Sequence, residues 1–147
     1  MTKILFVCLG NICRSPMAEA VLKDKIRKRG LEGKFLVESK ATSDEEIGNP
    51  VYPPAARELE RRGLGAFRHR AEQVKKSNYA AFDLIICMDH GNLAFLRRLF
   101  NGDPLGKVHL LGEYSSQGEI ADPWYTGKFA ECFDEIERGC EALLDVL

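Results

Sequence analysis

Residues 3–16 read KILFVCLGNICRSP, and this stretch decides the fold of the chain. The apolar run at residues 4–7 is typical of a strand that is buried on both faces of a parallel sheet. Residues 8–13 form a short loop, and from Arg14 to Arg29 the apolar side chains recur at helical spacing. The sequence therefore predicts a strand, a tight loop and a helix, which is the first unit of an α/β fold.

Strand and helix patterns alternate along the rest of the chain. Strands are predicted at residues 35–41, 83–88 and 107–111, helices at residues 55–62, after Asp89 and from Phe129 to Leu147, and polar loops at residues 42–54 and 112–127. Ser15 and Asp89 are predicted to cap the helices that follow them, with Gly30 ending the first helix. This pattern predicts a single domain, residues 1–147, with an α/β doubly wound sandwich fold. A central parallel sheet of about four strands is expected, with helices on both faces.

The loops that follow the predicted strands should build a common site. In doubly wound sheets, ligands bind beyond the carboxyl ends of the strands. The loop at Cys8 leaves the first strand at this end, and the loops that begin near Thr42, Asp89 and Gly112 also follow strands. We therefore expect these loops to meet at one edge of the sheet.

The loop from Cys8 to Arg14 carries a thiol at one end and a guanidinium at the other. Backbone amides that lead into a helix N-terminus can surround a phosphate group, and Gly10 permits the backbone geometry that this requires. The predicted phosphate-binding residues are Leu9, Gly10, Asn11, Ile12, Cys13, Arg14 and Ser15. Arg14 can bind two phosphate oxygens with its planar fork. A helix N-terminus beside a cation also favours the thiolate form of a cysteine, so Cys8 is the predicted nucleophile.

The leaving oxygen needs a proton, and Asp122 is the predicted donor. It lies in the stretch Asp122-Pro123-Trp124-Tyr125, within the polar loop that follows the last strand. Repulsion from a bound phosphate favours the protonated form of a carboxyl, which then suits it to protonate the leaving group. The same carboxylate can next activate a water molecule. The predicted reaction is a two-step displacement that needs no metal and no cofactor.

Each of these residues also has a less specific interpretation. A single cysteine at the end of a strand is usually an inert small hydrophobe, and an Asp-Pro pair favours a turn. The combination of Cys8, Arg14 and Asp122 favours the catalytic interpretation. Trp124 and Tyr125 either pack over the last helix or form walls that hold an aryl ring, and we favour the second interpretation.

The composition argues against several function classes. The formal net charge is −1, so no overall field attracts nucleic acid or an anionic membrane. No apolar stretch is long enough to cross a bilayer, and no signal peptide is recognised. The five cysteines, an odd number, predict reduced thiols, of which Cys87, Cys132 and Cys140 are expected to fill the core. We therefore expect a cytoplasmic protein, monomeric or weakly self-associating, with no nucleic-acid or membrane partner.

Charge is unevenly distributed along the chain. Basic residues gather between residues 23 and 34, and acidic residues gather between residues 131 and 145. Exposed helix faces usually carry such charges, so two solvated helix faces are the favoured interpretation and a docking surface is the alternative.

Five stretches of the sequence carry a family resemblance, in order and spacing. They are Val7–Pro16, Ala41–Ser43, His69–Gln73, Phe82–Asp89 followed by Asn92, and Asp122–Tyr125. In these stretches the chain resembles the low-molecular-weight protein tyrosine phosphatase family along its whole length. The first stretch is similar to the phosphate-binding loop of that family and the last to its general-acid loop. The resemblance implies hydrolysis of phosphotyrosine in a protein substrate, with phosphate as a product and without a cofactor.

The resemblance also implies a role for each residue of the site. The reacting groups are Cys8 as nucleophile, Arg14 as oxyanion binder and Asp122 as acid. The supporting groups are Asn11, which shapes the loop, Ser15, which contacts the thiolate, and Ser43, His69 and Asp89, which brace the loop. Two further implications are that Cys13 can trap oxidised Cys8 as a disulfide and that Tyr125 can be phosphorylated.

The chain departs from the family beside the expected pocket. Many members carry an aromatic residue in the loop after the second strand, where this chain has the acidic stretch Asp44–Gly48, with Glu45 expected to flank the substrate. Glu72 also stands where a basic or amide residue is frequent. Two other functions stay open. Thiol-dependent arsenate reduction needs further cysteines that relay electrons, whereas a phosphopeptide-binding module needs neither a thiolate nor an acid.

Overall fold

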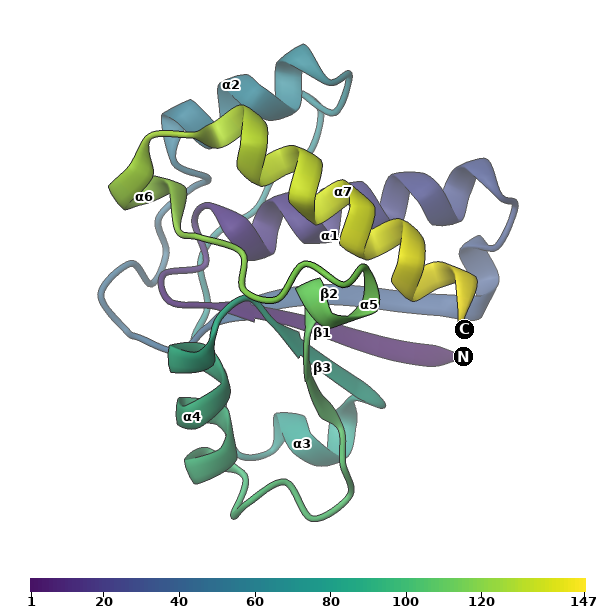
Figure 1. The fold of residues 1–147 in the computed structure, drawn as a ribbon, viewed down its shortest axis with the longest axis vertical. Helices are drawn as coiled ribbons and strands as arrows, with labels where there is room; N and C mark the ends of the chain where they lie inside the picture. Colours follow the sequence, from purple (N-terminus) through teal and green to yellow (C-terminus); the bar gives the residue numbers. More distant parts are fainter.

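The computed structural model describes residues 1–147 as a four-stranded parallel sheet between two layers of helices (Figure 1). The strands are β1 (Thr2–Cys8), β2 (Phe35–Ala41), β3 (Leu84–Cys87) and β4 (Val108–Leu110). All neighbouring strands pair in parallel, in the order β2-β1-β3-β4. The chain therefore builds the sheet from β1 first toward one edge and then toward the other, which confirms the predicted doubly wound fold.

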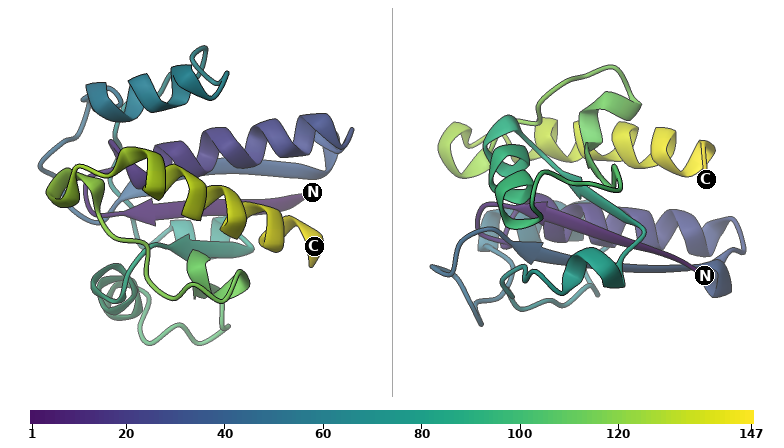
Figure 2. Two further views of the ribbon diagram at one scale, coloured as in Figure 1. Left: turned by 45° about the horizontal axis from the view of Figure 1, so that its top comes forward. Right: turned by 90° about the horizontal axis from the view of Figure 1, so that it is seen from below.

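The helices form two groups on opposite faces of the sheet (Figure 2). One face carries α1 (Arg14–Lys28), α2 (Pro53–Arg61) and α7 (Phe129–Asp145), and the other carries α3 (Asn78–Ala81) and α4 (His90–Leu99). Three single turns lie in the connections: η1 (Glu32–Lys34), α5 (Leu111–Tyr114) and α6 (Pro123–Thr126). None of these helices is both long enough and apolar enough to span a membrane.

Burial on both faces explains the uninterrupted apolar run of β1. Ile4 and Phe6 belong to the larger core, which α1 and α7 cover, whereas Leu5 and Val7 belong to the smaller core beneath α4. All four side chains are fully buried. A strand in this position shows no alternation of apolar and polar residues because neither face meets water.

The first helix has a different cap residue from the one that the sequence predicted. Arg14 is its first residue and Cys13 occupies the cap position, so the prediction that Ser15 caps this helix is wrong. The loop turns directly into the helix, and the Ser15 hydroxyl contacts the Cys8 sulfur at 3.0 Å instead of capping the backbone.

Other predicted boundaries agree with the structure to within two residues. The second helix begins at Pro53, with proline in its first turn, two residues before the predicted start. The polar loop at residues 112–127 contains the short helix α6 and most of α5. The last helix ends at Asp145, two residues before the predicted end at Leu147, and Leu147 is 47% exposed. Asp89 does cap α4, in a capping box with Asn92, as predicted.

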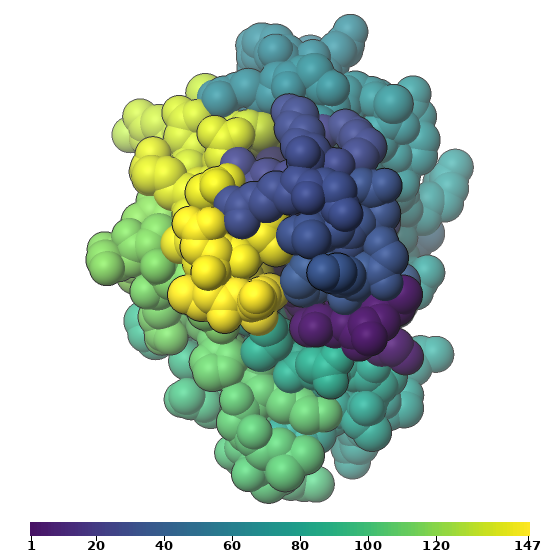
Figure 3. Space-filling model, turned by 90° about the vertical axis from the view of Figure 1, so that its right-hand side faces the viewer, coloured from purple at the N-terminus to yellow at the C-terminus, as the bar shows by residue number.

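The basic and acidic segments lie beside each other at the surface. Figure 3 shows the end of the chain (yellow) against the segment around residue 30 (dark blue). Lys25 forms an ion pair with Glu141 at 2.7 Å, and Arg29 pairs with Glu141 and with Asp145. The two charge clusters are therefore partly paired with each other across the contact between α1 and α7.

Candidate active site

The carboxyl end of β1 opens into a pocket of about 130 Å³. The pocket lies where the sheet order reverses, between β1 and β3, which is the usual ligand position in doubly wound sheets. Its lining residues are Cys8, Leu9, Gly10, Ile12, Cys13, Arg14, Ser43, Glu45, Glu46, Asp122, Trp124 and Tyr125. The loops after β1 and β2 and the loop that carries Asp122 therefore meet at this pocket, as predicted.

Three hydrogen-bonding groups approach the sulfur of Cys8. The backbone nitrogens of Asn11 and Ser15 lie 3.3 and 3.4 Å from Sγ, and the Ser15 hydroxyl lies at 3.0 Å. The sulfur also sits at the N-terminal end of α1, where the helix dipole is positive. These donors and this dipole stabilise negative charge on sulfur, so the site suits a thiolate.

The loop that follows Cys8 carries backbone donors without partners. The N–H groups of Leu9, Gly10, Ile12, Cys13 and Arg14 make no hydrogen bond within the protein. Asn11 shapes the turn by adopting a left-handed backbone conformation with φ of 59°, which asparagine accepts more readily than most residues. A loop with several free N–H groups at the start of a helix is the pattern that binds phosphate.

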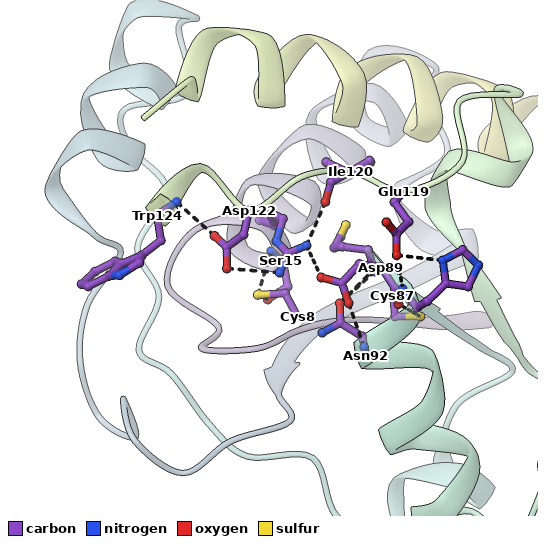
Figure 4. A network of polar contacts seen from close by, with 12 residues as sticks. Cys8, Ser15, Cys87, Asp89, Asn92, Glu119, Ile120, Asp122 and Trp124 are labelled. Carbon is purple, nitrogen blue, oxygen red and sulfur yellow. Dashed lines mark hydrogen bonds and ion pairs between the residues drawn. The ribbon is translucent and has the colours of Figure 1, made fainter. Parts of the chain in front are cut away.

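Arg14 is almost fully buried beside the sulfur, at 2% exposure. Its Nη1 donates to Asp89 Oδ2 at 2.7 Å and to the Ile120 carbonyl at 2.8 Å, and its Nη2 donates to Asp122 Oδ2 at 3.3 Å (Figure 4). Burial by itself lowers the pKa of Arg14, but the negative groups at Cys8, Asp122 and Asp89 outweigh it, so the pKa is raised. The guanidinium therefore remains charged at the floor of the pocket.

Asp122 and two aromatic residues form one side of the pocket. Asp122 Oδ1 accepts a hydrogen bond from the Trp124 nitrogen at 3.0 Å and thereby caps α6. Trp124 packs against Tyr52 with 4.6 Å between ring centroids, and Tyr52 in turn lies 6.1 Å from the Phe129 ring. Trp124 and Tyr125 are 50% and 76% exposed at the pocket mouth, where walls for an aryl ring were expected. Sequence reasoning did not identify Tyr52, which supports the Trp124 ring.

The Asn11 side chain connects the loop to the structure behind it. Its Oδ1 accepts from the Glu72 nitrogen at 3.1 Å and lies 2.7 Å from His69 Nε2. Its Nδ2 donates to Ser15 Oγ at 2.8 Å and to Ser39 Oγ at 3.0 Å. Because the Ser15 hydroxyl contacts the Cys8 sulfur, this side chain positions a group that touches the predicted nucleophile.

Two buried polar residues behind the loop were missed by sequence reasoning. Ser39 Oγ donates to Glu19 Oε1 at 2.7 Å, and Lys23 forms an ion pair with Glu19 Oε2 at 2.6 Å. Both Ser39 and Glu19 occupy buried positions, one on β2 and one on α1, among apolar residues. A polar residue at an inward-facing position is the sequence signal that could have revealed them. Burial lowers the pKa of His69, whose Nδ1 faces Glu19 at 3.7 Å.

Ser43 contacts the loop through its backbone. Its nitrogen donates to the Leu9 carbonyl at 3.0 Å, while its hydroxyl accepts from the Glu45 nitrogen at 3.4 Å. The side chain itself makes no hydrogen bond to the loop that follows β1. The support expected from Ser43 therefore comes from its main chain.

The remaining four cysteines are buried free thiols. Burial raises the pKa of Cys87 and of Cys132 to about 12. Burial also raises the pKa of Cys13 and of Cys140. These four thiols therefore stay protonated near neutral pH, in contrast to a thiol that serves as a nucleophile.

The comparison with known proteins agrees with this site. A sequence model of the family described as low molecular weight phosphotyrosine protein phosphatase matches residues 3–147. The chain belongs to the low molecular weight phosphotyrosine protein phosphatase family. This is a family of hydrolases, and the resemblance recognised in the sequence is confirmed.

Individual members of the low molecular weight phosphotyrosine protein phosphatase family are similar over nearly their whole length. The low molecular weight protein-tyrosine-phosphatase YfkJ of Bacillus subtilis is 41% identical over 147 residues, which cover 98% of this chain and 94% of the relative. The low molecular weight phosphotyrosine protein phosphatase of Gallus gallus is 40% identical over 148 residues, which cover 97% of this chain and 93% of the relative. The crystal structure of the Bacillus subtilis YfkJ aligns with a TM-score of 0.93 at 40% identity, covering 99% of this chain and 94% of that structure.

Proposed function

We propose that this protein hydrolyses phosphotyrosine in protein substrates and releases inorganic phosphate. One observation carries the proposal: two backbone N–H groups and the Ser15 hydroxyl converge on the Cys8 sulfur, within a loop whose other N–H groups are free, in a pocket that Arg14 and Asp122 also line. Membership of the family and the names of its relatives as tyrosine phosphatases support the same activity.

In the first step the Cys8 thiolate attacks phosphorus, a sulfur–phosphorus bond forms, and the bond to the tyrosine oxygen breaks. The free N–H groups of the loop and the Arg14 guanidinium stabilise the charge on the equatorial oxygens. Asp122 gives its proton to the leaving oxygen, and Trp124 and Tyr125 hold the aryl ring at the mouth. The products of this step are the dephosphorylated tyrosine and a cysteinyl-phosphate.

In the second step the Asp122 carboxylate removes a proton from water, and the water oxygen attacks the cysteinyl-phosphate. The sulfur–phosphorus bond breaks and phosphate leaves. The returning negative charge on sulfur meets the Ser15 hydroxyl at 3.0 Å and the two backbone nitrogens. All groups that the two steps require belong to this chain.

The alternative functions receive less support from the site. Arsenate reduction needs further thiols that relay electrons. Cys13 lines the pocket, but burial raises its pKa. Cys87, Cys132 and Cys140 do not line the pocket, and burial raises their pKa values too. A binding module has no use for the carboxyl of Asp122 beside the guanidinium of Arg14. Both observations favour the hydrolase.

The proposed setting follows from the same chemistry. A thiolate nucleophile and four further free thiols suit a reducing compartment, so we place the protein in the cytoplasm. Its proposed partner is a phosphotyrosine-containing protein, and it acts as a monomer or a weakly self-associating species without nucleic acid or membrane.

Two substitutions test the mechanism in hydrolysis of phenyl phosphate and 4-nitrophenyl phosphate without added metal. Cys8→Ser is expected to lower kcat by at least about 10³-fold because it removes the thiolate nucleophile. Asp122→Asn is expected to lower kcat for phenyl phosphate by about 10²-fold or more, and to lower it less for 4-nitrophenyl phosphate, whose leaving group needs protonation less.

Cys132→Ser is the matched control, because it makes the same change in a buried thiol outside the pocket. It is expected to keep the parent rate, and thermal unfolding of every variant shows that the proteins are folded. Hydrolysis by Cys8→Ser at the parent rate contradicts the mechanism. An equal loss for both esters in Asp122→Asn contradicts the role of this carboxyl as the acid.

A further inference from the structure

The mouth of the pocket is acidic on the side of β2. Glu45 and Glu46, from the loop at residues 42–49, line the pocket together with Asp122. Glu46 lies close to the phosphate-binding loop, since a Cβ atom added to Gly10 would lie 3.5 Å from its Cγ. Sequence reasoning singled out Glu45 but not Glu46, although both carboxylates stand at the rim.

Hydrogen bonds hold this acidic loop in place. Asn49 Nδ2 donates to Glu46 Oε2 at 2.6 Å, and the Asn49 nitrogen donates to the Glu46 carbonyl at 2.9 Å. The Gly48 nitrogen donates to the Ala71 carbonyl at 2.8 Å, and the Ser43 nitrogen donates to the Leu9 carbonyl at 3.0 Å. The loop backbone is thus fixed at both ends, and the Glu46 carboxylate is held in place at the mouth.

No cation of the protein neutralises these two carboxylates. Neither Glu45 nor Glu46 takes part in an ion pair, and Asn49 is neutral. Arg14 is the single cation that lines the pocket, and it is already paired with Asp89 and Asp122. Arg70, which lies near the loop, donates to the Gly48 carbonyl and not to a carboxylate. The rim therefore offers negative charge to whatever approaches it.

We propose that Glu45 and Glu46 make this phosphatase select phosphotyrosine sites that are flanked by lysine or arginine. The inference rests on the proposed function, because it concerns the chain on either side of the phosphotyrosine. A pocket of about 130 Å³ has room for the phosphorylated side chain, so the neighbouring residues of the substrate lie at the mouth. There the rim attracts ammonium and guanidinium groups and repels carboxylates, which gives specificity by charge.

The experiment compares kcat/KM for three phosphotyrosine peptides of equal length, with lysine, serine or glutamate on both sides of the phosphotyrosine. The parent is expected to prefer the lysine peptide over the glutamate peptide. Glu45→Gln and Glu46→Gln are each expected to reduce this preference by about two- to fivefold, the range for an exposed charge pair. Glu45→Lys is expected to reverse it, and added salt is expected to weaken it in the parent.

Glu32→Gln is the matched control, because it removes one exposed carboxylate beside the amino end of β2, at the opposite edge of the sheet. It is expected to keep the parent ratio between the peptides. The deciding quantity is the ratio of kcat/KM for the lysine peptide to kcat/KM for the glutamate peptide. The inference is overturned if the parent has a ratio near one or below one, or if both glutamine variants keep the parent ratio.

Hydrolysis of 4-nitrophenyl phosphate separates this outcome from a failure of the proposed function. This ester has no flanking residues, so its turnover reports the phosphatase chemistry alone. Turnover of the ester without discrimination between the peptides rejects the selective rim and leaves the phosphatase in place. No turnover of the ester or of any peptide rejects the proposed function itself.

Discussion

At the scale of the residue, Asn11 does two things that no other residue type does equally well. Its backbone adopts a φ of 59°, and its side chain is fully buried with both the oxygen and the nitrogen hydrogen-bonded. The carboxamide joins the loop to Ser39 on β2 and to Glu72 in the segment beyond α2. The position of the proposed phosphate-binding loop therefore depends on a side chain that does not line the pocket.

Asn11→Ala is expected to lower the free energy of unfolding by about 2–4 kcal/mol, because it removes several buried hydrogen bonds and leaves their partners unsatisfied. It is also expected to lower kcat/KM by about 10²-fold, through displacement of the loop. Urea unfolding and hydrolysis of 4-nitrophenyl phosphate measure the two effects. Asn101→Ala is the control, since Asn101 has a φ of 54° but is exposed. It is expected to cost about 1 kcal/mol from backbone strain and to keep the activity. Equal effects of the two substitutions would contradict a positioning role for the Asn11 side chain.

At the scale of the element, the last helix can pack closely against α5 because of one small residue. Gly139 lies on the buried face of α7, against Leu111 at the start of α5. A Cβ atom at this position would lie 2.6 Å from Leu111 Cγ, which is far below contact distance. The absence of a side chain therefore sets the distance between α5 and α7.

Gly139→Ala tests this packing because two effects oppose each other. In a helix, alanine is more stabilising than glycine by about 1 kcal/mol. Overpacking a core, in contrast, lowers the free energy of unfolding by about 1–3 kcal/mol. Because Leu111 Cγ is a branch point close to the backbone, we expect overpacking to outweigh helix propensity and the free energy of unfolding to fall by up to about 2 kcal/mol. Gly33→Ala is the control, because no atom lies within 4 Å of the added Cβ. This substitution is expected to change the free energy of unfolding by less than about 0.5 kcal/mol. A Gly139→Ala protein more stable than the parent would contradict the close packing.

At the scale of the whole molecule, the network behind the loop joins segments that are distant in the sequence. His69 lies near Asn11 and Ser39, and it faces Glu19 from α1. Burial lowers the pKa of His69, even though Glu19 and Glu72 act to raise it. The folded protein therefore favours the neutral ring at a place where the loop, the sheet and the first helix meet.

The pH dependence of stability follows from the direction of this shift. The unfolded chain binds a proton at His69 below a pH of about 6.5, while the folded chain resists it. The free energy of unfolding is therefore expected to fall as the pH drops below about 6.5. Urea unfolding between pH 5 and pH 8 measures the slope, and His69→Gln is expected to reduce it. The same slope in parent and variant would show that other groups cause the dependence.

The sequence by itself determined the alternation of strands with the longer helices, and it named the candidate reacting groups. The apolar run at residues 4–7 specifies a strand buried on both faces, and helical spacing from Arg14 specifies the helix, because periodicity and burial are local properties of a chain. Cys8, Arg14 and Asp122 could be named as candidates from their places in the chain. The loop from Cys8 to Arg14 follows the first predicted strand, and Asp122 lies in the polar loop after the last one.

The tertiary structure alone decided how these groups are supported. The contact of the Ser15 hydroxyl with sulfur, the burial of Glu19 beside Ser39, and the Tyr52 ring behind Trp124 all join residues from different elements. Such contacts depend on how the helices pack on the sheet, which no local pattern records. For the same reason the absence of a cation near Glu45 and Glu46 is visible only once the loops have met, because charges distant along the chain become neighbours only in the folded protein.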